Sequence, residues 1–195
     1  MYAVGIGIFG NLQWNNNRFV GDTPTTTDIL GPFYRPGAPS RRNLNPPGFR
    51  GEILHLAGTI YKEDGKTPAS KSLIEIWQCN EQGLYDNVSD EYVYRAKQEA
   101  GANGKYAFIT SIPVAYPTEN NPNQFRPAHI HMRISAEGLQ DLITQIYFKG
   151  DPHLATDPST KSPLSVNRIM TLQKVKEKES KLQFDIALRK EYLPD

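Results

Sequence analysis

His129-Ile130-His131-Met132-Arg133-Ile134-Ser135 decides the fold, because apolar and polar side chains alternate along this stretch as they do in a β-strand. Successive side chains of a strand point to opposite faces, so both imidazoles would share the face opposite the isoleucines. Two imidazoles on one strand face make half of a transition-metal site, although a solvated sheet face can show the same pattern. The stretch therefore predicts a β-sheet, and it predicts a metal site only if other segments supply further ligands.

Composition limits both the partners and the kind of metal site. The 195 residues suit one domain with a substantial core, or one domain with an arm. Lysine and arginine total 22 against 21 acidic residues, so we expect no nucleic-acid partner. The single cysteine, Cys79, cannot form an internal disulfide or a cysteine-rich zinc site. A metal would therefore need nitrogen and oxygen ligands.

The sequence also indicates where the protein resides. No apolar run approaches the roughly 20 residues that a helix needs to span a bilayer, so we expect no membrane partner. Residues 1–10 lack the basic n-region of a secretory signal. We therefore expect a cytoplasmic protein, with a trimmed export leader as the alternative.

Residues 21–47 are rich in Pro, Gly, Thr, Asn and Asp, a composition that disfavours regular structure. At their centre stands Gly31-Pro32-Phe33-Tyr34-Arg35-Pro36-Gly37. We expect an irregular arm that lies over another part of the protein. The predicted organisation is an N-terminal arm over residues 1–50, followed by a β-sandwich domain over residues 51–195.

Short apolar stretches bounded by turn residues follow the arm. One helix is expected over residues 164–174, where Val166, Ile169 and Met170 share a face. Many short strands, long loops and little helix favour an all-β fold, an antiparallel β-sandwich with an irregular N-terminal arm and one short helix. The expected strands cover residues 53–61, 72–78, 106–112, 129–135, 142–150 and 182–189.

Two long connections carry tyrosines. Residues 80–103 include Tyr85, and residues 113–125 include Tyr116, shortly before the paired histidines. Loops of this length beside a rigid sheet are where functional groups tend to lie. A phenol becomes an anionic oxygen ligand when a strongly charged metal lowers its pKa. Taken alone, each tyrosine is more typical of a surface residue than of a ligand.

Four blocks of sequence are together far more specific than any single motif, and two weaker blocks flank them. The weaker blocks are Gly31-Pro32-Phe33-Tyr34 and Phe184-Asp185-Ile186-Ala187-Leu188-Arg189. The four main blocks are Ile74-Glu75-Ile76-Trp77-Gln78-Cys79-Asn80 with Gly83-Leu84-Tyr85, then Gly104-Lys105-Tyr106 through Ile112-Pro113 to Tyr116-Pro117, then Arg126-Pro127-Ala128-His129-Ile130-His131, then Leu142-Ile143-Thr144-Gln145-Ile146-Tyr147-Phe148 with Gly150-Asp151-Pro152.

In their order and spacing these blocks resemble the intradiol ring-cleavage dioxygenases, nearest the iron-bearing subunit of protocatechuate 3,4-dioxygenase. The resemblance implies a ferric ion, Fe(III), held by Tyr85, Tyr116, His129 and His131. It further implies that Tyr116 and His131 form the axial pair. Two tyrosinates and one hydroxide would neutralise the three positive charges of such an ion, and hard oxygen donors favour the trivalent state.

The resemblance also implies an activity and its partners, a small aromatic diol and O2. Such an enzyme cleaves a catechol-type ring between its two hydroxylated carbons and gives a cis,cis-muconate type diacid. Tyr116 would accept a proton from the diol. Arg126 would stabilise negative charge on the ring, and Gln145 would orient Arg126 or the oxygen species.

The ring substituent is predicted less directly. Arg35, Arg95 and Arg133 lie in or near segments expected around the pocket, and a guanidinium suits a carboxylate. A carboxylated catechol such as protocatechuate is therefore favoured. Thr118 and Phe125 stand where relatives often have other aromatics, which leaves catechol or hydroxyquinol as the alternative substrate.

Other residues and function classes complete the set of expectations. His55 and His153 lack any motif and are interpreted as structural, Cys79 as a small buried hydrophobe, and Tyr106 as a core residue. A cupin-like metal barrel is an alternative, but Glu137 comes too late after the second histidine for that pattern. A non-enzymatic binding sandwich is another alternative, and a homo-oligomer is left open.

Overall fold

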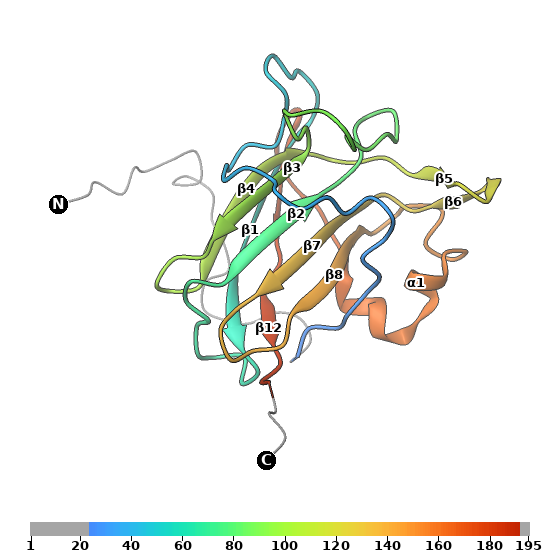
Figure 1. Cartoon of the computed structure of the whole chain (residues 1–195). Helices are drawn as coiled ribbons and strands as arrows, with labels where there is room; N and C mark the ends of the chain where they lie inside the picture. Colours follow the sequence, from blue (N-terminus) through green and yellow to red (C-terminus); the bar gives the residue numbers. More distant parts are fainter. Residues whose placement is uncertain (1–23, 192–195) are drawn as a thin grey trace.

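Two β-sheets packed face to face form the body of the protein (Figure 1), which a computed structural model describes over residues 24–191. The first 23 residues of the predicted arm lie outside the described range. One sheet has the strand order β3-β2-β7-β8-β9, and the other has the order β10-β11-β1-β12 with β4 paired to β1. The strands of the first sheet are β2 (Leu73–Trp77), β3 (Arg95–Glu99), β7 (His129–Ser135), β8 (Leu142–Phe148) and β9 (Ile169–Met170). The strands of the second are β1 (Ile53–Lys62), β4 (Lys105–Ser111), β10 (Gln173–Lys176), β11 (Glu179–Gln183) and β12 (Ile186–Leu188).

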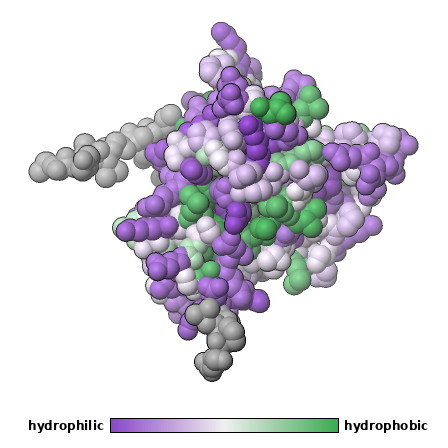
Figure 2. Space-filling model, viewed as in Figure 1, coloured by the Kyte–Doolittle hydropathy of each residue, from purple (hydrophilic) through white to green (hydrophobic). Residues whose placement is uncertain are grey.

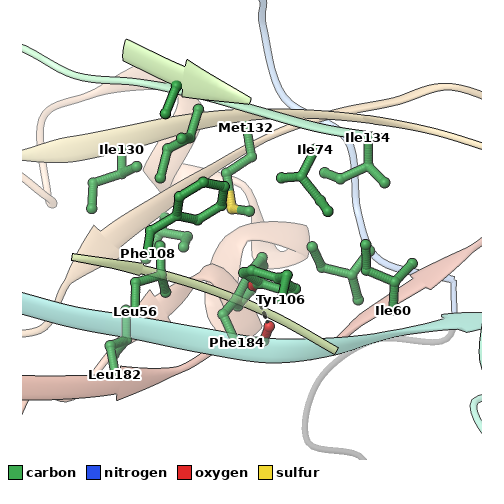
Figure 3. Close-up of a cluster of buried hydrophobic side chains, with 14 of the residues drawn as sticks. Leu56, Ile60, Ile74, Tyr106, Phe108, Ile130, Met132, Ile134, Leu182 and Phe184 are labelled. Carbon is green, nitrogen blue, oxygen red and sulfur yellow. Dashed lines mark hydrogen bonds between the residues drawn. The ribbon is translucent and has the colours of Figure 1, made fainter. Parts of the chain in front are cut away.

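The core lies between the two sheets, where the apolar face of β7 meets β1 and β4 (Figure 3). Ile130, Met132 and Ile134 are fully buried there, as the alternation of β7 predicts. Tyr106 is also a core residue, as predicted, and its hydroxyl donates to the carbonyl of Phe184 at 2.6 Å. The histidine face of β7 consequently points outward, away from the core.

The all-β sandwich is confirmed, and its sheets are mixed. Antiparallel pairing joins β2 to β3 and β7, β7 to β8, and β1 to β4. Parallel pairing joins β1 to β11, β1 to β12, and β8 to β9. A short hairpin, β5 (Tyr116–Thr118) with β6 (Asn121–Arg126), forms a separate two-stranded sheet within the long connection before β7.

The predicted strand 182–189 is divided into two, because the chain bends at Phe184 and Asp185. β11 pairs with the first half of β1 and β12 with the second half. Between them the Phe184 carbonyl approaches Gly58 so closely that a Cβ at Gly58 would lie 1.9 Å from its oxygen. The Asp185 side chain then accepts from the Thr59 backbone N–H at 2.9 Å, which replaces a ladder hydrogen bond.

The predicted helix over residues 164–174 is wrong. This segment forms a 3-10 helix, η2 (Pro163–Arg168), followed by β9 and β10. Leu164 and Val166 are 66% and 64% exposed, so the apolar residues of the pattern do not bury a helical face. Within residues 24–191 the one α-helix is a single turn, α1 (Pro158–Lys161), whose N-cap is Asp157.

The arm lies over the outer face of the first sheet, as expected. Its residues run along β8 and then cross toward β3 (blue in Figure 1). The backbone of Asp28 donates to the Ile143 carbonyl at 2.8 Å, and Thr144 donates to the Thr26 carbonyl at 3.0 Å. The surface on this side is largely hydrophilic with a few hydrophobic patches (Figure 2). Over the range that the structure describes, no helix is long and apolar enough to cross a membrane.

Candidate metal centre

The two histidines of β7 lie side by side on the outward face of the first sheet. His129 is opposite Tyr147 of β8, and His131 is opposite Gln145 of β8 and Trp77 of β2. Although this face points away from the core, both imidazoles are 0–1% exposed because the arm and the loop after β2 cover them. The outer face of β7 therefore forms the floor of a second buried region.

The predicted tyrosines join these histidines from two separate loops. Tyr85 lies in the loop after β2, where Asn80 accepts from the backbone of Gln82 and Leu84 at 2.9 Å and so fixes a turn. Tyr116 is the first residue of β5.

Four donor atoms meet at one point. The two Nε2 atoms of His129 and His131 are 3.1 Å apart. His129 Nε2 is 3.3 Å from the Oη of Tyr85 and 3.3 Å from the Oη of Tyr116, and the two phenolic oxygens are 3.5 Å apart. The structure thus brings together the four residues that the resemblance predicts as ligands.

Burial makes every charged form unfavourable at this point. It raises the pKa of the Tyr85 phenol well above its usual value, with the neighbouring Tyr116 as the second cause, and it also raises the pKa of Tyr116. Burial, assisted by the positive charge of Arg126, lowers the pKa of His129 to about 3. The pKa of His131 is lowered well below its usual value by burial and by His129. At neutral pH the imidazoles are therefore neutral and carry the lone pairs that metal binding needs.

The tautomer of His129 suits a metal ligand. The Pro127 carbonyl lies 2.6 Å from Nδ1 and can only accept, so Nδ1 carries the proton and Nε2 presents its lone pair to the centre. The ring of His131 is fixed by Trp77, which stacks on it with centroids 4.8 Å apart and planes inclined by 7°. His129 is consequently held with Nε2 facing both phenolic oxygens, and His131 with Nε2 beside that of His129.

The donor set fits a hard cation of high charge. Residues 24–191 contain no group of three or more His, Cys, Asp or Glu residues that could hold a metal, so a metal bound at the histidine pair would take the two phenols as its further ligands. Nearby positive charge reverses the effect of burial on a phenol, because it favours the phenolate. Each of the two buried phenols would therefore lose its proton when such a cation binds.

Arg126 borders the centre and its side chain is fixed by three residues. It pairs with Tyr116 across the β5–β6 hairpin. Its Nε donates to Asp157 at 2.6 Å, and its Nη2 donates to Gln145 and to the Tyr147 hydroxyl at 3.0 Å each. Burial alone would lower the pKa of Arg126, but Tyr147 and Asp157 outweigh it and the net shift is upward.

Gln145 lies between Arg126 and the arm. Its Nε2 donates to the Ile29 carbonyl at 2.7 Å, which leaves Oε1 to accept from Arg126. Sequence reasoning predicted both residues near the centre, and the structure places them in contact.

Three further residues of this network carried no usable signal in the sequence: Asp28, Tyr147 and Arg168. The Tyr147 hydroxyl is 2.9 Å from an oxygen of Asp28, and Asp28 forms a buried ion pair with Arg168. They come from the arm, β8 and η2, three segments whose contact depends on the tertiary fold. Tyr147 alone could have been noticed, because it follows Gln145 by two residues on the same strand face.

The arm also contributes two close contacts to the ligand rings. Phe33 stacks on Tyr85 with centroids 4.4 Å apart. Gly31, at φ +76°, approaches His131 so closely that a Cβ there would lie 3.1 Å from the ring carbon Cε1. The arm is thus a wall of the centre, a role that the sequence predicted only as lying over another part of the protein.

The three arginines considered for a substrate carboxylate have other partners. Arg95 is 1% exposed and donates to the carbonyls of Phe33 and Asp86 at 2.7 Å each. Arg35 donates to the Ser89 carbonyl at 2.6 Å, and Arg133 pairs with Asp141 at 2.8 Å. Arg35 and Arg95 therefore fix the loop that carries Tyr85.

The residues interpreted as structural supply none of the four donor atoms. His55 is buried beside Glu179, with Nε2 2.9 Å from Oε1. Cys79 is buried as predicted. Phe125 stacks on His153 with centroids 5.0 Å apart.

Comparison with known proteins agrees with the sequence blocks. The family model described as a dioxygenase matches residues 29–190. Catechol 1,2-dioxygenase 2 of Acinetobacter lwoffii is 36% identical over 154 residues, which cover 70% of this chain and 55% of that protein. The beta chain of protocatechuate 3,4-dioxygenase of Burkholderia cepacia is 38% identical over 117 residues, covering 55% of this chain and 49% of that protein. The chain thus spans about half the length of these relatives.

A solved structure shows the same fold over nearly its whole length. It is the dioxygenase domain of a dioxygenase carbohydrate-binding protein fusion from Streptomyces sp. SirexAA-E, with a TM-score of 0.74 and 28% sequence identity. The superposition covers 86% of this chain and 99% of that domain. Because the family match begins within the arm at residue 29 and includes both sheets and all four converging donors, this chain belongs to the intradiol dioxygenase family.

Proposed function

We propose that the protein is a non-haem Fe(III) dioxygenase that cleaves a catechol-type ring between its two hydroxylated carbons with O2. The product would be a cis,cis-muconate type diacid. The observation that carries this proposal is the meeting of two phenolic oxygens and two imidazole nitrogens within 3.1–3.5 Å, beside a buried guanidinium.

Tyr85, Tyr116, His129 and His131 would hold the ferric ion. When bound, the ion supplies Lewis-acid chemistry, since it draws charge from a chelated diolate and makes the ring reactive toward O2. The chain's own residues then have three tasks, which are to take up protons, to place a positive charge, and to exclude water.

Tyr116 is suited to the proton transfer. A diol must lose both hydroxyl protons to bind as a dianion, and the Tyr116 phenolate can accept one of them at Oη. Burial favours the protonated phenol, because it raises the pKa of Tyr116. Tyr116 lies at the base of the short β5–β6 hairpin, outside the two sandwich sheets, so its backbone is not held by the sheet that carries the histidines.

Arg126 is suited to stabilise charge that builds on the ring during attack. Its guanidinium stays protonated and is mostly buried, at 13% exposed, so its field acts through a medium of low polarity. Gln145 fixes it from β8. The arm excludes water from the ligands, since Phe33 covers Tyr85 and Gly31 covers His131.

The first experiment measures iron content and the visible spectrum of the purified protein, because a tyrosinate bound to Fe(III) gives a strong charge-transfer band. We expect about one iron per chain. Tyr116→Phe should shift or weaken the band and retain part of the iron, whereas His129→Ala, which removes a neutral ligand from the sheet face, should lose most of it. A colourless wild type that binds zinc and does not change on iron reconstitution would reject the ferric centre.

For the ring substituent we propose a carboxylated catechol, protocatechuate or a close relative. Support comes from the resemblance of residues 74–80 and 142–152 to that type. The partners of Arg35, Arg95 and Arg133 described above mean that the substituent would be recognised by groups other than these side chains. O2 uptake with catechol, protocatechuate, hydroxyquinol and 4-methylcatechol decides between them, and a preference for uncharged rings would reject the carboxylate while keeping ring cleavage.

A further inference from the structure

Asp157 is a buried carboxylate with two separate tasks. It is 2% exposed and precedes α1. Its Oδ1 accepts from the Ser159 backbone N–H at 2.9 Å and caps the helix, while its Oδ2 accepts from Arg126 Nε at 2.6 Å. A cap needs only one oxygen and no charge, so the second contact requires its own explanation.

The contacts of Arg126 involve two of the three nitrogens of the guanidinium. Asp157 accepts a hydrogen bond from Nε, and Gln145 and Tyr147 each accept one from Nη2. Across the described part of the chain, Nη1 has no hydrogen-bond partner. Because the guanidinium is planar, fixing Nε and Nη2 also fixes the direction of the two N–H bonds of Nη1. Arg126 therefore keeps one free pair of donors in a set orientation.

We propose that Asp157 is a positioning residue, whose carboxylate holds the Arg126 guanidinium so that Nη1 is free to meet the negative charge of the reacting ring. This inference rests on the proposed function. Gln145 and Tyr147 are neutral and both contact Nη2, so they hold the guanidinium at one of its nitrogens. The ionic contact at Nε provides the second fixed point, and an ionised partner makes the stronger hydrogen bond.

The other buried charges nearby indicate that Asp157 pairs with Arg126 alone. Arg168, the other buried cation of the network, is paired with Asp28 on the far side of Tyr147. Asp157 and Asp28 thus each pair with a different guanidinium, and Asp28 could not replace Asp157 without leaving Arg168 without its ion-pair partner.

The test uses Asp157→Asn in the full-length, iron-loaded protein. Asparagine is as good an N-cap as aspartate, so α1 keeps its cap while the charge at Nε is lost. We expect kcat for the preferred diol to fall about 10- to 100-fold, with iron content unchanged and KM changed less than about twofold. Ser162→Ala is the matched control, because Ser162 caps η2 through Leu164 N and does not contact Arg126. This control should retain wild-type kcat.

A double-mutant cycle with Arg126→Ala separates positioning from a general structural role. If Asp157 acts through Arg126, the double variant Arg126→Ala/Asp157→Asn should match Arg126→Ala alone within about twofold. Losses that multiply would overturn the proposal, as would an Asp157→Asn variant with unchanged kcat.

A crystal structure of Asp157→Asn gives a second measurement that does not depend on turnover. We expect the Arg126 guanidinium to be rotated or disordered, while His129, His131, Tyr85 and Tyr116 keep their places. A guanidinium in its original position would overturn the positioning role. Wild-type protein that takes up no O2 with any diol would instead reject the proposed function, so the two failures are distinguishable.

Discussion

The ring of Phe33 lies against the ring of Tyr85, with centroids 4.4 Å apart and planes inclined by 16°. Phe33 belongs to the arm, and its carbonyl accepts from Arg95 at 2.7 Å. An irregular segment far away in sequence is thus fixed at both its side chain and its backbone against a predicted metal ligand. The stability of the centre should therefore depend on residues outside the sandwich.

Phe33→Leu should weaken iron retention without unfolding the protein. A stacked aromatic pair contributes about 0.5–1.5 kcal/mol beyond the area that it buries, which corresponds to about a 2- to 10-fold effect on an equilibrium. The measurement is the rate of iron loss to a chelator, followed by the visible band. Phe49→Leu, in the wall of a separate cavity beside His55, is the control and should leave the rate unchanged.

Gly31→Ala should affect both stability and iron, whereas Gly138→Ala should affect stability alone. Both glycines have positive φ, +76° and +70°, where an L-residue costs about 1–2 kcal/mol. Only at Gly31 would the new Cβ press on His131, since nothing lies within 4 Å at Gly138. Denaturant unfolding and iron content measure the two effects, and equal iron content in both variants would contradict the contact.

Arg126→Ala should keep iron and colour but lose turnover by about 10²-fold or more, because the guanidinium acts on charge that develops in the transition state. Iron per chain and kcat, measured on the same sample, test this. Arg50→Ala, at an exposed position, controls for loss of one positive charge and should retain full turnover. Unchanged kcat in Arg126→Ala would remove Arg126 from the mechanism.

Arg95→Met should destabilise the protein strongly, because Arg95 at the start of β3 fixes the loop that carries Tyr85. Arg95 is 1% exposed and donates to the carbonyls of Asp86 and Phe33 and to the Asn87 side chain. Burial lowers its pKa, and the negative charge of Asp86 offsets this only in part. Each buried acceptor left unpaired costs about 1–3 kcal/mol. Thermal unfolding should show a larger loss than for Arg35→Met, which removes one hydrogen bond to Ser89 and a cation–π contact with the partly exposed ring of Tyr92, and the reverse order would contradict this role.

The parts of the fold that sequence reasoning predicted are those with short-range patterns. The alternation at β7 gave its bounds at both ends, since one face is core and the other is buried under the arm. β3 was missed because Arg95–Glu99 is mostly polar, and its burial comes from the arm and β2. The helix prediction over residues 164–174 was wrong because Ile169 and Met170 pair with β8, a contact that helical spacing cannot indicate.

In the candidate site, too, some residues could be predicted from the sequence and others depend on tertiary contacts. The four converging residues were predicted from blocks of sequence that preserve order and spacing. Asp28, Asp157 and Arg168 could not be predicted, because each contacts a partner from a distant segment and each residue type is common on surfaces. Their roles follow from burial and pairing, which only the tertiary structure provides.

The pairing of Tyr116 with Arg126 at the base of the β5–β6 hairpin has a consequence for how this protein can be engineered. The hairpin closes through the turn at Glu119 and Asn120, and the residues next to it on β6 are exposed. A peptide grafted into the turn would lengthen a free tip and leave the base unchanged. A single residue inserted within either strand would instead flip the side chains that follow it to the opposite face. The hairpin thus accepts an inserted peptide at its tip, beyond the register shift between Pro117 and Thr118, but no insertion between this shift and its base.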